Sequence, residues 1–228
     1  MANHEENLKV NLALLKELAN KKTAIEASKK IESIIESLHD RQEFAHYHYH
    51  AFKNMMSKVN TDLAKIEMAF SMNDDDRRNK IAIKANISAC IQSIHITHDI
   101  LAYLITTILN LDLSENKITF YNVKEKLNNY KNLKKLLVDF SSHDDYKYLT
   151  SYVNHTKHRF HVEPKVTYHF TGNKHYSAQF ERFSFKNKEY SEQDVDKFIN
   201  REYNREAKLI IMIENELISI LESNEIVQ

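Results

Sequence analysis

The chain has 228 residues with 32 basic and 32 acidic side chains, so its formal net charge at pH 7 is zero. A balanced chain has no overall attraction to a polyanion or a membrane, and any such contact must use a local patch. The single cysteine excludes an intrachain disulfide and favours a reducing compartment, so we expect a cytoplasmic protein. The first residues lack the basic and apolar regions of a secretory signal, and no apolar run reaches the roughly 20 residues of a membrane span.

Glycine and proline are nearly absent, with Gly172 and Pro164 the sole examples. Folds with glycine-rich phosphate loops need glycine where the backbone turns tightly or approaches a ligand. Helix bundles tolerate its loss. The composition therefore predicts an all-α helical bundle, forming a single domain over residues 1–228, with no cofactor.

The hydrophobic pattern predicts two long helices in the first half of the chain. Thr23 and Glu26 match a capping box, and the helix that follows is expected to run to about residue 72. The second helix, over about 76–111, has an apolar stripe with alternating steps of four and three. The stripe consists of Ile87, Ile91, Ile94, His98, Leu101, Ile105 and Ile108.

Two shorter helices are predicted next. The first is polar and covers about residues 121–140. The second is expected to be capped by Ser142 and Asp145 and to end near Phe160, because Pro164 cannot continue a helix.

Alternating apolar residues after Pro164 indicate strands. One strand over 165–170, a turn at Gly172 and a second strand over 178–185 predict one β-hairpin before the last helix. Ser191 and Asp194 are expected to cap that helix. Its segment 209–213 is apolar on nearly all sides, so the helix is either central in the bundle or shared with a partner, and we expect a homodimer.

The richest candidate site is the run YVNHTKHR over residues 152–159. On a helix, Asn154, Lys157 and His158 share one face. An amide, an ammonium and an imidazole together suit a phosphate or a base edge, and histidine also transfers protons near neutral pH. Because cations are favoured at helix C-termini, the same residues also fit an ordinary solvated helix end.

This run resembles the NxxKH-type signature of the HEPN superfamily of bacterial RNA-handling domains. The segment HITHDILAYLITTILNL, residues 95–111, is similar to a second helix of one branch, and the hairpin before a long last helix also matches it. The resemblance implies a metal-independent endoribonuclease of a defence or toxin–antitoxin type. His158 and Asn154 would be catalytic and Asp99 would orient them, while Lys157, Arg159 and His155 would contact RNA. It also implies RNA or a nucleotide as partner, with no DNA and no membrane.

The chain departs from the family at one decisive position. The arginine that precedes the asparagine in the family motif is replaced by Val153, and Arg159 points about 100° away from His158 on a helix. A family arginine would stabilise the charged transition state. A member that binds RNA without cleaving it is therefore expected at least as strongly as an active nuclease.

Three alternatives remain open on the sequence. Arg41 and His46 repeat an Arg-x4-His spacing in another part of the chain. His46, His48 and His50 could bind a metal together with residues of another helix, although a rim of amphipathic side chains is the simpler interpretation and no metal site is expected. Finally, the bundle could be a scaffold without catalytic activity, in which case the motif face would be ordinary surface.

Overall fold

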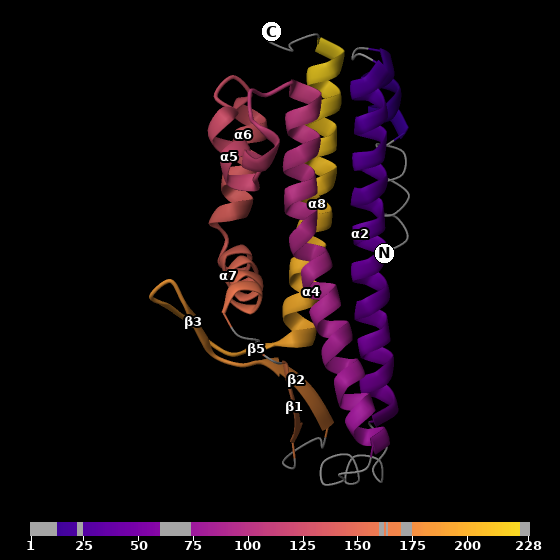
Figure 1. Cartoon of the computed structure of the whole chain (residues 1–228), viewed down its shortest axis with the longest axis vertical. Coiled ribbons are helices and arrows are strands. Elements are labelled where there is room, and N and C mark those ends of the chain that lie inside the picture. The colour runs from indigo at the N-terminus through magenta and orange to yellow at the C-terminus, as the bar shows by residue number, and fades with distance from the viewer. Residues whose placement is uncertain are drawn as a thin grey trace. The chain divides into compact units, whose positions relative to one another are not determined.

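The computed structural model describes residues 13–21, 25–59, 74–159, 162, 164–169 and 175–223. Helices dominate these residues, and a small antiparallel β region precedes the last helix, which confirms the all-α prediction (Figure 1). The helices are α2 (Ile25–Val59), α4 (Asp74–Leu109), η1 (Glu115–Lys117), α5 (Phe120–Lys126), α6 (Lys131–Ser142), α7 (Asp144–His158) and α8 (Val195–Ser223). The strands are β1 (Pro164–His169), β2 (His175–Phe180), β3 (Phe183–Phe185), β4 (Lys188–Tyr190) and β5 (Gln193–Asp194).

The two long helices predicted from periodicity are present. Every member of the predicted stripe on α4, including His98, is buried. The helix expected to begin at the Thr23 capping box is α2, which is described as far as Val59. Thr23, the expected end near residue 72 and the turn at Gly172 all lie outside the described residues.

The helix predicted over 121–140 is wrong in one respect, because the structure has two helices there. Thr119 caps α5 by accepting a hydrogen bond from the Asn122 amide, and α5 ends where Leu127 leaves helical geometry at φ −84°, ψ 36°. The Tyr130 amide then donates to the Leu127 carbonyl at 3.2 Å, closing a turn before α6. Asn128 and Asn129, which lie in this turn, favour turns over helix interiors because their side chains compete for backbone hydrogen bonds.

Of the three predicted helix caps, the one at Thr23 lies outside the described residues, and the one at Ser142 is in the wrong place. Ser142 is the last residue of α6, where its hydroxyl donates to the Asp139 carbonyl at 2.8 Å, and the extended His143 separates α6 from α7. At the last helix, Asp194 is the cap, and its carboxylate accepts from the Lys197 amide at 2.9 Å. A carboxylate at this position satisfies a free amide and favours the helix dipole.

The β region has more strands than the predicted hairpin. β1 pairs with β2 in antiparallel register from Pro164↔Phe180 to His169↔His175, and β5 adds to β2. The strand predicted over 178–185 breaks after Phe180, because β3 turns away to pair with β4. The β3–β4 turn holds Lys186 at φ 50° and Asn187 at φ 62°, the left-handed backbone of a two-residue hairpin loop.

The described residues form two compact units. The first contains the described parts of Met1–Arg41, Ile96–His143 and Asn204–Gln228, and the second those of Gln42–His95 and Asp144–Tyr203. In the first unit, α5 and α6 pack beside the 96–109 part of α4, where His98 contacts Phe120 and Phe140 at ring-centroid distances of 5.7 and 5.2 Å. In the second unit, α7 and the strands share one aromatic core.

The core of the first unit contains an unusual set of polar side chains. His98 Nε2 lies 3.3 Å from a carboxylate oxygen of Glu206, and the two side chains are 3% and 1% exposed. Glu214 is fully buried, and neither of its carboxyl oxygens has a hydrogen-bond partner among the described residues. Burial raises the pKa of Glu214 to about 8, because a low dielectric disfavours the charged form.

Glu214 should make the protein lose stability as the pH rises. Its folded pKa of about 8 lies above the usual 4.5, so its favourable contribution is complete below pH 4.5 and is lost as the pH rises through 8. Each pKa unit corresponds to about 1.4 kcal/mol, so the effect should reach a few kcal/mol. Glu214→Gln should flatten the pH dependence of the free energy of unfolding, measured by urea denaturation between pH 5 and 9.

The control is Glu222→Gln, which removes an exposed carboxylate from the same helix and should leave the curve unchanged. Equal pH dependence of the wild type and Glu214→Gln would contradict a buried, protonated Glu214.

Candidate functional site

The motif predicted to carry the site forms the second half of α7. The helix begins with Asp144 and Asp145 and ends with Lys157 and His158, an order of charges that complements the helix dipole. One side of it is held in the aromatic core. Tyr152 packs on Phe180 at 4.8 Å between ring centroids, and its hydroxyl donates to the Val162 carbonyl at 2.7 Å. These contacts fix the rotation of the helix about its axis.

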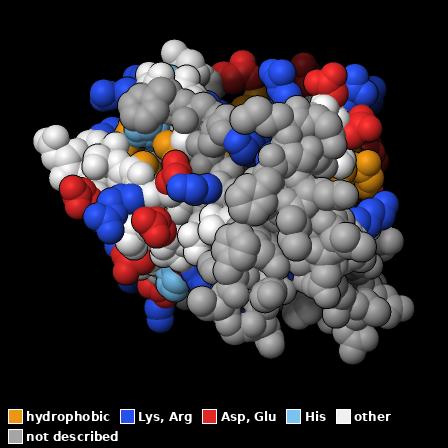
Figure 2. Space-filling model, turned by 90° about the horizontal axis from the view of Figure 1, so that it is seen from below, with side chains coloured by type: hydrophobic (Ala, Val, Ile, Leu, Met, Phe, Trp, Pro, Cys, Tyr) orange, Lys and Arg blue, Asp and Glu red, His pale blue; other side chains and the backbone are white. Residues whose placement is uncertain are grey.

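With the helix fixed in this way, the cationic residues at its end face solvent. Lys157, His158 and Arg159 are exposed, and Asn154 is partly buried with its amide donating to the Thr150 carbonyl at 2.9 Å. These residues form a local patch of the kind that a chain of zero net charge would need for contact with a polyanion. On the described part of the face shown in Figure 2, basic and acidic side chains are interleaved.

His155 does not fit its expected role as an RNA contact. Its side chain is 3% exposed and packs on Phe183 and Phe185, with ring centroids 5.7 and 6.2 Å apart. It lies three residues before His158, but it faces the β3 strand. His155 therefore connects the motif helix to the hairpin and is too buried to contact a ligand directly.

Val153, at the position where the resemblance to the HEPN superfamily implies an arginine, belongs to the core. It is 2% exposed and is part of the apolar cluster that includes Tyr152, Ile91 and Phe180. An arginine here would have to bury its charge. The valine that replaces the arginine of the motif is thus a core packing residue in this fold.

His95 is a further titratable residue, outside the motif of α7. It lies on α4 in the second unit and is partly buried. Burial, and then the positive charge of Lys157, lower its pKa to about 4, so the ring is neutral at pH 7. The charge of Lys157, at the exposed end of α7, therefore acts on a histidine of α4. The spacing of residues in the sequence could not have indicated this interaction, because the two helices are far apart along the chain.

Asp99 lies in the first unit and Asn154 and His158 in the second, so a joint site of the three stays a prediction. Asp99 is exposed and borders a groove of about 490 Å³. The groove is lined by Lys30, Ser33, Ile34, Ser37, Asp99, Ile100, Tyr103 and Ile118. Its Tyr103 donates a hydrogen bond to Glu115 and faces the Lys30 ammonium, which lies 4.7 Å from the ring centroid.

The three neighbouring histidines of α2 divide into a pair and a single residue. The rings of His46 and His50 are 4.2 Å apart, while His48 lies 2.9 Å from the Asn86 amide oxygen. Within the described ranges, no three histidine, cysteine or acidic side chains are placed to hold a metal ion.

The comparisons with known proteins give no family assignment. No protein-family model, curated protein or solved structure matches the chain. In the described part of the chain, every helix is too short or too polar to cross a membrane.

Val153→Arg, which restores the family spacing, should destabilise the protein. An uncompensated buried charge costs about 3–5 kcal/mol, and the larger side chain adds strain to a filled core. Thermal unfolding followed by circular dichroism should show a lower Tm and no gain of RNA cleavage. His158→Arg, which places the same charge at the exposed end of α7, should change Tm little. A stable Val153→Arg protein that cleaves RNA would contradict this prediction and would show that position 153 can hold a catalytic arginine.

Lys157→Gln should raise the pKa of His95, because it removes the positive charge that opposes protonation. The value should stay below 6.5, since burial is the larger cause of the shift. A pH titration of the histidine ring signals by NMR measures this directly. Lys147→Gln, a matched charge loss near the other end of α7, should leave the pKa of His95 unchanged. If the pKa of His95 is the same in the wild type and in Lys157→Gln, the charge of Lys157 does not act on His95.

Proposed function

We propose that the protein binds RNA through the exposed end of α7, formed by Asn154, Lys157, His158 and Arg159, and does not cleave it. The observation that carries this proposal is the exposure of Lys157, His158 and Arg159 in sequence, while the residues before them are fixed in the core. We call this surface the α7 end.

The chemistry of the α7 end suits a polynucleotide. Lys157 and Arg159 can neutralise phosphates, and the planar guanidinium can donate two parallel hydrogen bonds to one phosphate. The amide of Asn154 and the imidazole of His158 can hydrogen-bond base edges or ribose hydroxyls. His95, neutral at pH 7 and within the influence of Lys157, adds no charge to this surface.

Binding without cleavage follows from the same packing. The resemblance to the HEPN superfamily implies an arginine and a histidine as the catalytic pair, and here the arginine position is the buried Val153. Arg159 is a poor substitute, because adjacent residues on a helix point about 100° apart. His158 is the remaining group that could transfer a proton, so any residual cleavage should disappear in His158→Ala.

The homodimer expected from the sequence is a separate proposal. Three of the five apolar residues near Ile211, namely Leu209, Ile210 and Ile213, are buried within the first unit. Met212 is 45% exposed and is the clearest remnant of the apolar excess. We therefore place the RNA contact on the α7 end and assign no part of it to a dimer interface.

The double variant Lys157→Gln, Arg159→Gln should bind RNA roughly 10- to 30-fold more weakly at low salt, because two exposed ionic contacts of up to about 1 kcal/mol each are lost. The slope of log affinity against log salt should fall by roughly 0.7 for each phosphate contact removed. Fluorescence anisotropy with a labelled single-stranded RNA measures both quantities.

Lys147→Gln is the matched control, since it neutralises an exposed lysine near the start of the same helix. Its affinity and salt slope should equal those of the wild type. Absence of RNA binding by the wild-type protein at low salt would overturn the proposal and leave the scaffold alternative.

A further inference from the structure

The β3–β4 hairpin lies directly against the motif helix. Phe185, the last residue of β3, contacts the ring of His155 at 6.2 Å, and α7 and β3 pack together. His158 follows His155 by three residues and therefore lies about one turn further along the same side of α7, and Arg159 comes directly after it. The hairpin and the α7 end are therefore neighbouring parts of one unit.

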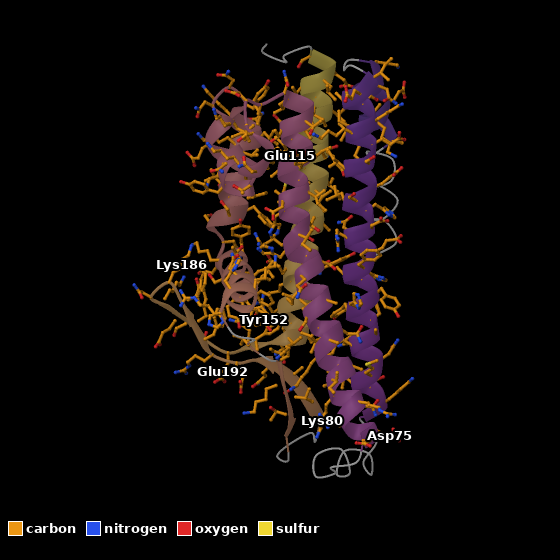
Figure 3. The ribbon with its side chains drawn as sticks, viewed as in Figure 1. Asp75, Lys80, Glu115, Tyr152, Lys186 and Glu192 are labelled. Atoms are coloured by element: carbon orange, nitrogen blue, oxygen red, sulfur yellow. The ribbon has the colours of Figure 1, made fainter. Side chains whose placement is uncertain are left out.

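The hairpin places a cation beside each of two partly exposed aromatic rings. The Lys186 ammonium lies 5.5 Å from the centroid of Phe185, and the Lys188 ammonium lies 5.1 Å from that of Tyr190. Phe185 and Tyr190 are partly buried, and both lysines are exposed. Figure 3 shows Lys186 at the tip of the hairpin.

The backbone at this tip is held in a costly conformation. Lys186 has φ 50°, a left-handed value that glycine or asparagine adopts more easily than lysine. Lysine at this position therefore costs stability. What it contributes is a cation at the tip of the hairpin, next to an aromatic ring.

We propose that this hairpin holds one nucleotide of a single-stranded RNA, with its base stacked on Phe185 and its phosphate on Lys186. The inference rests on the proposed function. It adds that the bound RNA is single-stranded and that it extends from the α7 end to the hairpin. An aromatic ring can stack on an unpaired base, whereas the bases of a duplex are already stacked on one another. The exposed lysine side chain can move from the ring to the phosphate when the base arrives.

A tryptophan at position 185 tests the stacking directly, because the natural chain contains no tryptophan. Phe185→Trp should keep the affinity for a short oligouridylate, and its fluorescence should be quenched as the RNA is added. Phe185→Leu should lower the affinity for the same oligouridylate by about 5- to 100-fold, the loss expected for one stacked base. Its affinity for an RNA duplex should not change.

The matched control is Tyr121→Leu. Tyr121 is a 64% exposed aromatic residue with the Lys124 ammonium 4.9 Å from its ring, but it belongs to the first unit. Its loss should leave RNA affinity unchanged. Lys186→Asn, which suits the left-handed turn, should weaken oligouridylate binding while raising Tm.

The outcomes separate the two proposals. If the wild type binds no RNA, the proposed function and this inference both fail. If it binds RNA, but Phe185→Trp is not quenched and Phe185→Leu binds oligouridylate normally, the hairpin contact alone is overturned. Should Phe185→Leu fail to fold, Phe185→Trp and Lys186→Asn decide the question.

Discussion

The packing of α7 against the aromatic residues of β2, β3 and α8 decides which residues of the motif helix reach solvent. Tyr148 contacts Phe183 and Phe198 at ring-centroid distances of 5.4 and 5.0 Å, and Tyr152 contacts Phe180 at 4.8 Å. Large rings in such edge and tilted contacts leave a helix little freedom to rotate. With Val153 and His155 also inside, the exposed groups of the motif are those at its very end.

The same packing bears differently on the two functions that the resemblance implies, RNA cleavage and RNA binding. The resemblance implies a catalytic arginine and histidine on one accessible face, and the residue at the arginine position is the buried Val153. The surface that remains is cationic and exposed, which suits binding to phosphate. This is why we propose that the protein binds RNA and does not cleave it, with the hairpin beside His155 adding aromatic and cationic groups that suit a single strand.

Local patterns predicted the helices well, but they predicted the exposure of the side chains in the candidate site only in part. The stripe on α4 and the cap at Asp194 depend on residues a few positions apart, which the sequence contains in full. The break between α5 and α6 was missed because Leu127 to Tyr130 contain neither glycine nor proline.

The sequence could place Lys157 and His158 on one face but could not show which way that face points. Whether His155 meets Phe185 or solvent depends on strands that fold back from later in the chain. The effect of Lys157 on the pKa of His95 depends on two helices, α7 and α4, that are far apart in the sequence. The burial of Glu214 was also beyond the pattern, since a carboxylate on a long helix is normally exposed.

The central claim is that the α7 end and the neighbouring hairpin form one RNA-binding surface. The most direct measurement is an NMR titration of the labelled protein with a short single-stranded RNA, followed through the backbone amide signals. The account predicts that the shifts concentrate at residues 154–159 and 185–187 and are weakened by salt. Shifts confined to the groove residues around Asp99 and Tyr103, or no shifts at low salt, would contradict it.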